Sequence, residues 1–105
     1  MIKIYRVNYT VEAMEDLKAL YRYVAYEQQD VTNAERLIIA IRDAINLLDR
    51  MPKRHPLVNR PILNGKDAHR AIIKNHIILY QIDELNATVS ILRILSSRQN
   101  IENII

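Results

Sequence analysis

The spacing of apolar residues changes about two thirds of the way along the chain. Between Ala13 and Val24, and again between Leu37 and Leu48, apolar side chains recur at helical spacing, the pattern of a helix that buries one face. From residue 69 onward they come in short runs rich in isoleucine and valine, which is typical of strands. The pattern therefore predicts a helical first half and a sheet-forming end.

Local signals set the ends of the two predicted helices. Thr10 is a suitable N-cap for the first helix, which we expect to run to about Gln28. The second helix begins with a capping box, in which Thr32 accepts from the backbone while Glu35 reaches back. This helix must end before Pro52, because the residue before a proline disfavours helical geometry. Since the break between them is short, the two helices should form an antiparallel hairpin.

Four segments have the composition of strands, and tight turns link the last three. Lys74–Asn75 makes the first turn, since asparagine tolerates left-handed backbone angles, and residues 83–86 make the second. The predicted strands cover residues 2–8, 69–73, 76–82 and 88–95. The order β-α-α-β-β-β predicts an α+β fold, with the helix hairpin on one face of a small antiparallel sheet whose other face is partly open.

The remaining segments complete a single domain over residues 1–105. Residues 52–67 hold all three prolines and the only glycine, so we expect a loop there. Residues 98–105 can add a helical turn.

Composition excludes several classes of protein. A chain without cysteine has no disulfide, thiolate metal site or cysteine nucleophile, and it fits a reducing cytosol. The single glycine excludes a glycine-rich phosphate loop. Residues 1–6 lack the apolar stretch of a signal peptide, and no apolar run reaches the length of a membrane span. We therefore expect a cytoplasmic protein that makes no membrane contact.

The net charge of +3 is small, but the charges are unevenly placed. Between residues 50 and 74 the basic residues face a single acid, Asp67. A stretch of one sign attracts a polyanion or an acidic protein partner, although it can also be a solvated loop. The basic residues of this stretch are Arg50, Lys53, Arg54, Arg60, Lys66, Arg70 and Lys74.

Short segments distributed along the chain carry a family resemblance through their order and spacing. They are Glu15–Leu17, Tyr21–Ala25, Ala44–Leu48 with Met51–Pro52, Arg54–Val58, Arg70, Lys74–Asp83, Ile91–Leu95 and Arg98–Asn100. Together they resemble the RelE/ParE toxins of type II toxin–antitoxin modules, also called plasmid-stabilisation proteins. The resemblance spans essentially the whole chain, and it implies the same fold order.

The resemblance implies a growth-arresting toxin that a cognate antitoxin neutralises by wrapping around it. RelE-like members cut messenger RNA in the ribosome, whereas ParE-like members poison DNA gyrase. RNA cleavage requires groups that activate the 2′-hydroxyl, stabilise charge on the phosphate and protonate the leaving oxygen. The RelE-like branch usually has an arginine where Ile77 stands, and the wider family often has a histidine or tyrosine where Ser96 stands. The residues Ile77 and Ser96 therefore depart from the pattern that RNA cleavage requires. An apolar residue at the position of Ile77, with a histidine before it as in His76, is common in ParE-like members, so the sequence favours gyrase inhibition over RNA cleavage. An inactive relative that only binds protein is a further alternative.

The candidate site residues are cations on the predicted sheet and on the loop before it. For binding the target or a nucleic acid they are Lys53, Arg54, Arg70, Lys74 and Arg98. If the chain is a nuclease, the catalytic candidates are Arg70, Lys74, His76, Tyr80 and Arg98.

Several of these residues also have a purely structural interpretation. Arg70 and Arg98 can flank the open face and hold a phosphate. Alternatively, Arg70 is an edge-strand charge that prevents sheet pairing, and Arg98 contacts a carbonyl or an acid. Tyr80 fits a core tyrosine with a bonded hydroxyl better than a platform for base stacking. Arg93, inside an apolar strand, is expected to extend to solvent or to pair with an acid from a helix.

Two further features concern ligands and partners. The spacing of His55, His69 and His76 matches no zinc motif, so we expect neither a metal nor another cofactor. The isoleucines near the end of the chain either pack on the core or form an exposed apolar patch for the antitoxin. They are Ile101, Ile104 and Ile105. The expected partners are a cognate antitoxin and, as target, DNA gyrase or the ribosome with its messenger RNA.

Overall fold

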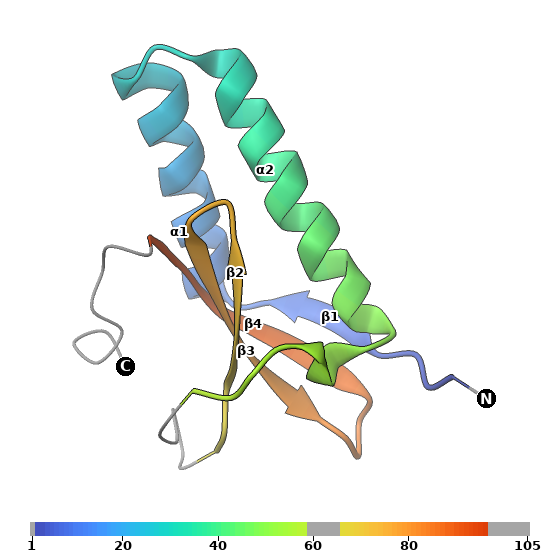
Figure 1. The fold of residues 1–105 in the computed structure, drawn as a ribbon. Helices are drawn as coiled ribbons and strands as arrows, with labels where there is room; N and C mark the ends of the chain where they lie inside the picture. The colour runs from blue at the N-terminus through green and yellow to red at the C-terminus, as the bar shows by residue number, and fades with distance from the viewer. Residues whose placement is uncertain (1, 59–65, 97–105) are drawn as a thin grey trace.

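The computed structural model describes residues 2–58 and 66–96 and shows two helices packed on one face of a four-stranded sheet (Figure 1). The elements are β1 (Arg6–Tyr9), α1 (Val11–Arg22) with a π-helical turn (Tyr23–Glu27), α2 (Val31–Asn46), β2 (His69–Ile73), β3 (His76–Asp83) and β4 (Thr88–Ser96). Short 3₁₀ turns at Leu47–Asp49 and Pro52–Arg54 connect α2 toward β2. The predictions made for Arg60, Arg98, Ile101, Ile104 and Ile105 lie outside the described residues.

The helix ends were predicted correctly in one case and wrongly in the other. Thr10 caps α1, because its Oγ1 accepts the backbone N–H of Ala13 at 3.1 Å. The capping box predicted for α2 is wrong. Asp30 is the N-cap, and its carboxylate accepts the backbone N–H of Asn33 at 3.0 Å. A carboxylate there also compensates the positive end of the helix dipole, which favours the earlier start.

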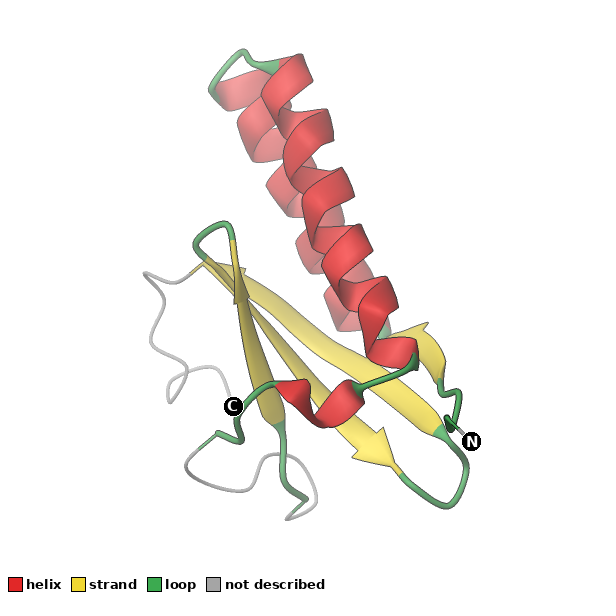
Figure 2. Ribbon diagram, turned by 45° about the vertical axis from the view of Figure 1, so that its right-hand side comes forward, coloured by secondary structure: helices red, strands yellow, loops and turns green. Residues whose placement is uncertain are grey.

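The helix hairpin is anchored to the sheet at one end only. Near the sheet, Ile41 and Ile45 of α2 are fully buried in a core cluster that also contains Ile78 and Ile91. Burial of each such side chain contributes about 1.5–3 kcal/mol. The other end of the hairpin projects beyond the sheet (Figures 1 and 2). There a separate cluster of Val24, Ala25 and Ala34 joins the two helices, so this end is held by the hairpin's own contacts.

The strand order is β1-β4-β3-β2. The strands β2, β3 and β4 form the predicted antiparallel meander. The prediction of an entirely antiparallel sheet is wrong, because β1 pairs in parallel with β4, from Arg6 beside Thr88 to Tyr9 beside Ile91. The first strand is also shorter than predicted. Ile2 and Ile4 lie before it and are exposed, so the alternation at the N-terminus overstates its length.

The second face of the sheet is partly open, as the sequence predicts. Ile77, Leu79 and Leu95 point to this face and are at most 6% exposed. Exposure remains on the outer strand, where Ile72 is 62% exposed and Arg70 is also exposed. The apolar residues of β3 and β4 are therefore buried on both faces, whereas Arg70 and Ile72 of β2 present side chains of this face to solvent.

Residues of α1 and its cap complete the edge of β4 beyond the point where β1 ends. Thr10 Oγ1 donates to the Leu92 carbonyl at 3.0 Å, and the Asp16 carboxylate accepts the backbone N–H of Ile94 at 3.0 Å. The same carboxylate holds the Arg93 guanidinium through two bonds of 2.7 and 2.9 Å. The hydrogen bonds that Arg93 donates to the Asp16 carboxylate raise the pKa of Arg93. The expectation that Arg93 pairs with an acid from a helix is confirmed.

Candidate target-binding site

The β2–β3 turn holds two of the predicted site residues, Lys74 and His76. The two turn residues both have left-handed backbone angles, with φ of 50° at Lys74 and 64° at Asn75, as a two-residue hairpin requires. Asparagine adopts this conformation readily, but for lysine it costs on the order of 1 kcal/mol. The Ile73–His76 pairing holds Lys74 there, although asparagine or glycine would suit the position better.

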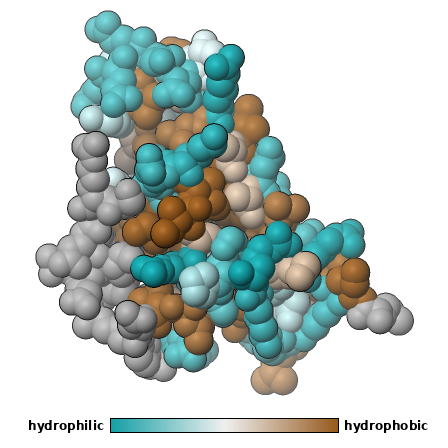
Figure 3. Space-filling model, viewed as in Figure 1, coloured by the Kyte–Doolittle hydropathy of each residue, from teal (hydrophilic) through white to brown (hydrophobic). Residues whose placement is uncertain are grey.

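The turn faces the helix hairpin across a hollow of about 750 Å³, which we call the turn hollow. The sheet contributes polar side chains to it, and the hairpin contributes both polar and apolar ones. The lining residues are Lys74, Asn75, His76 and Ser96 from the sheet, and Leu20, Tyr23, Val24, Gln28, Asn33 and Leu37 from the hairpin. His76 Nδ1 lies 2.7 Å from the Lys74 carbonyl oxygen, so the histidine ring is held against the turn. Figure 3 shows hydrophilic side chains over the hairpin tip and apolar ones gathered below it.

The other cations predicted for the site lie elsewhere. Arg70 stands opposite Leu79 in the strand register, so it belongs to the second face. Lys53 pairs with Glu84 at 3.1 Å, just beyond the far end of β3. Because β3 has 8 residues, its ends are about 25 Å apart. The candidate cations therefore do not form one surface: Lys53 and Arg54 lie together at one end of β3, Lys74 lies at the other end, and Arg70 lies on the second face.

Tyr80 is a core residue in this structure. Its side chain is fully buried, its hydroxyl donates to the Pro52 carbonyl at 2.6 Å, and the His69 ring stacks on it with centroids 5.2 Å apart. Burial raises the pKa of Tyr80 to about 12, so the phenol is protonated at neutral pH. The structural interpretation of Tyr80 is confirmed. The ring is buried in the core, where an RNA chain cannot contact it.

The histidines play structural roles around this tyrosine. His69 Nδ1 lies 2.7 Å from the His55 carbonyl oxygen, and the His55 ring meets Tyr80 edge-on. Burial, followed by the charge of Arg54 and by His69, lowers the pKa of His55.

Within residues 2–58 and 66–96, no cluster of histidine and carboxylate side chains is arranged to hold a metal ion. No helix of the same ranges has the length and apolar character that crossing a membrane requires.

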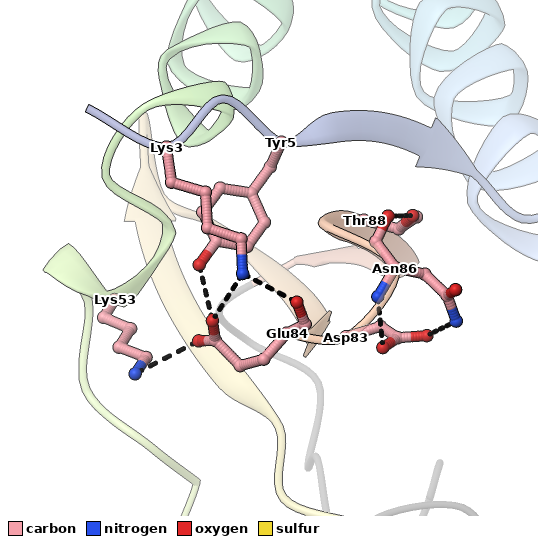
Figure 4. Close-up of polar contacts among 7 residues, drawn as sticks. All are labelled: Lys3, Tyr5, Lys53, Asp83, Glu84, Asn86 and Thr88. Carbon is pink, nitrogen blue, oxygen red and sulfur yellow. Dashed lines mark hydrogen bonds and ion pairs between the residues drawn. The ribbon is translucent and has the colours of Figure 1, made fainter. Parts of the chain in front are cut away.

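A polar cluster that local sequence patterns do not reveal ties the N-terminal segment to the β3–β4 turn (Figure 4). The Glu84 carboxylate accepts the Tyr5 hydroxyl at 2.7 Å and contacts Lys3 Nζ at 3.4 Å and Lys53 Nζ at 3.1 Å. The hydrogen bond from Tyr5, followed by those from Lys53 and Lys3, lowers the pKa of Glu84 to about 2. The partners are up to 81 positions apart in sequence, so no spacing pattern could have predicted the contact.

We expect Glu84 to make the stability of this protein depend on pH in the acid range. Its folded-state pKa of about 2 is below the ordinary value of 4.5, so its contribution is fully present above the ordinary value and is lost as the pH falls toward the folded one. The urea midpoint of Glu84→Gln should therefore fall less than that of the wild type across this window. The control is Glu35→Gln, which removes the charge of an exposed glutamate on α2. A urea midpoint of Glu84→Gln that falls with pH as much as that of the wild type would contradict the prediction.

Three solved toxin–antitoxin structures contain a chain with this fold. A chain of the chromosomal ParDE system of P. aeruginosa is 15% identical, with a TM-score of 0.69 over 90% of this chain and 97% of that one. A chain of the RelBE2 complex of Mycobacterium tuberculosis is 26% identical, with a TM-score of 0.63 over 91% and 94%. A chain of the archaeal RelE–RelB complex of Pyrococcus horikoshii is 16% identical, with a TM-score of 0.56 over 92% and 99%.

The fold is thus that of the RelE/ParE superfamily of type II toxins, as the resemblance in the sequence implied. The family model described as "ParE toxin of type II toxin-antitoxin system, parDE" matches residues 7–101. The chain belongs to this ParE toxin family. Among curated proteins, none has a sequence that matches the chain.

Proposed function

We propose that this toxin arrests growth in the cytoplasm by binding DNA gyrase, without cleaving RNA, and that a cognate antitoxin neutralises it. The observation that carries the proposal is the ParE family match over residues 7–101. The sheet supports it, because Ile77 is buried at the position where the RelE-like branch usually has an arginine. Tyr80 is buried as well, so neither position offers a group to a phosphate.

The turn hollow is the surface that we assign to the target. It joins the cation of Lys74 to amide and aromatic side chains of the hairpin, such as Gln28 and Tyr23. A concave surface that combines polar side chains with apolar ones such as Leu20 and Leu37 suits recognition of a protein segment. The left-handed backbone of Lys74 supports this assignment, since strained conformations are retained mainly at functional positions.

RNA cleavage is the second candidate, and two observations favour it. The RelBE2 chain has a higher sequence identity to this chain, at 26%, than the ParDE chain, at 15%. Lys74 and His76 also both line the turn hollow. An imidazole ring can serve as a general acid or base in RNA cleavage, and a lysine cation in the same hollow can stabilise the phosphate.

Induced expression without an antitoxin separates the two mechanisms. Gyrase inhibition predicts growth arrest with altered plasmid supercoiling while translated messages stay intact. Rapid cleavage of translated messages with normal supercoiling would instead support the nuclease and contradict the proposal. Unimpaired growth would also contradict it and would favour an inactive relative that only binds protein.

Replacing Lys74 by asparagine should weaken toxicity while preserving the fold. Asparagine suits the left-handed turn, and it replaces the long cationic side chain by a short neutral one. We expect about a tenfold higher level of Lys74→Asn to be needed for the same growth arrest, which corresponds to the loss of one charge-assisted contact. Arg42→Gln removes an exposed cation of α2 that does not line the turn hollow and should leave toxicity unchanged. Equal toxicity of Lys74→Asn and the wild type would show that the turn hollow does not bind the target.

A further inference from the structure

A second concave surface lies at the opposite end of β3 from the turn hollow. It is a groove of about 370 Å³, with Lys3 and Tyr5 on one side and residues 50–54 on the other. The Tyr5 backbone N–H donates to the Asp49 carbonyl at 2.7 Å and holds the two sides together. The cationic residues that line the groove are Lys3, Arg50, Lys53 and Arg54, and no acidic residue of the described chain lines it. We call it the basic groove.

The rim of the basic groove already binds a carboxylate. Glu84 reaches it from the β3–β4 turn and is held by Tyr5, Lys3 and Lys53 (Figure 4). This contact uses the two lysines and leaves the two arginines for another ligand. The groove can therefore bind a carboxylate with the side chains it presents, and it has cations left over after Glu84 is bound.

The two arginines differ in how firmly they are placed. Arg54 donates from Nε to the Met51 carbonyl at 3.0 Å and from Nη2 to the Leu47 carbonyl at 3.3 Å, which fixes its guanidinium over the turn. Arg50 is exposed, and its guanidinium makes no hydrogen bond or ion pair within residues 2–58 and 66–96. One arginine is thus positioned in advance, and the other is free to close on an anion.

Apolar side chains accompany these cations. Met51, which lines the groove, is 61% exposed, and Leu47, whose carbonyl binds Arg54, is 55% exposed. Exposed apolar residues among arginines are typical of protein interfaces. A nucleic-acid backbone offers phosphates but no aliphatic side chain to cover Met51. The combination therefore favours a peptide ligand.

We propose that the basic groove binds an acidic segment of a protein partner that also carries aliphatic side chains. Carboxylates of this segment bind Arg50 and Arg54, and an aliphatic side chain covers Met51. The groove is remote from the turn hollow, and this inference holds whether the toxin acts on gyrase or on RNA.

The test uses the purified full chain and two probes. One is a fluorescein-labelled peptide of aspartate and glutamate with regularly spaced leucines, and the other is an oligothymidylate of equal formal charge. We expect the peptide to bind and Arg50→Glu to weaken it about tenfold. Arg36→Glu makes the same change of charge on an exposed residue of α2 and should have little effect. Met51→Ser should weaken peptide binding without changing oligothymidylate binding.

Three results would overturn the proposal. The first is the absence of peptide binding at low salt. The second is an equal loss of affinity for Arg50→Glu and Arg36→Glu, because this would show only a general charge effect. The third is tighter binding of the oligothymidylate than of the peptide, which would make the groove a phosphate site. Arg50 is exposed, so its replacement should not unfold the chain, and circular dichroism checks this.

Discussion

Asp16→Ala is expected to lower the free energy of unfolding by about 3 kcal/mol. The substitution leaves the Arg93 guanidinium without its two hydrogen bonds and the Ile94 backbone N–H without its acceptor. The Asp16 side chain is only 17% exposed and the Arg93 side chain 31%, so water replaces these bonds incompletely. For a domain of this size the loss is a large share of the total stability. Urea denaturation at neutral pH measures it.

The neighbouring acid provides a matched control for this change. Glu15 is exposed on the same turn of α1, and Glu15→Ala should change the free energy of unfolding by less than about 0.5 kcal/mol. Equal effects of the two substitutions would show that helix propensity or charge, rather than the bonds at the β4 edge, accounts for the loss. A double variant with Arg93→Ala should cost less than the sum of the two single changes, because both remove the same pair.

Tyr80→Ala should lower the free energy of unfolding by about 3–5 kcal/mol, whereas Tyr80→Phe should lower it by only about 1 kcal/mol. The alanine removes a fully buried ring against which His69 stacks. The phenylalanine keeps the ring and loses only the bond from the hydroxyl to the Pro52 carbonyl. Thermal or urea denaturation of both variants measures the difference.

Toxicity distinguishes a structural tyrosine from a catalytic one. Because the hydroxyl is buried against Pro52, Tyr80→Phe should arrest growth as strongly as the wild type once expression levels are matched. Loss of toxicity in a Tyr80→Phe protein that remains folded would contradict the structural role. It would indicate instead that the Tyr80 hydroxyl takes part in catalysis.

The parts of the fold that could be predicted are those fixed by nearby residues. Helical spacing located both helices, and the Lys74–Asn75 turn fixed the β2–β3 register. The pairing of β1 with β4 could not be predicted, because Arg6 meets Thr88 across almost the whole chain and no local pattern records such a pairing. The N-cap of α2 was predicted wrongly because the spacing of Thr32 and Glu35 matched a capping box, whereas the helix begins directly after Asp30.

The candidate site was predictable to a similar extent. Lys74 and His76 lie together because one turn carries both. Lys53 was grouped with them by its position in a basic stretch, yet its contact with Glu84 places it at the opposite end of β3. The turn hollow also depends on Tyr23 and Gln28, which the sequence analysis did not select. These residues reach the site only through the packing of the hairpin over the sheet, so helical periodicity alone could not single them out.

Titration of the purified chain into a DNA gyrase supercoiling reaction tests the central proposal most directly. The account predicts inhibition that increases with toxin concentration, is relieved by the cognate antitoxin and is weakened about tenfold in Lys74→Asn. Unimpaired supercoiling at a toxin excess, together with cleavage of a message in a translating extract, would contradict the account.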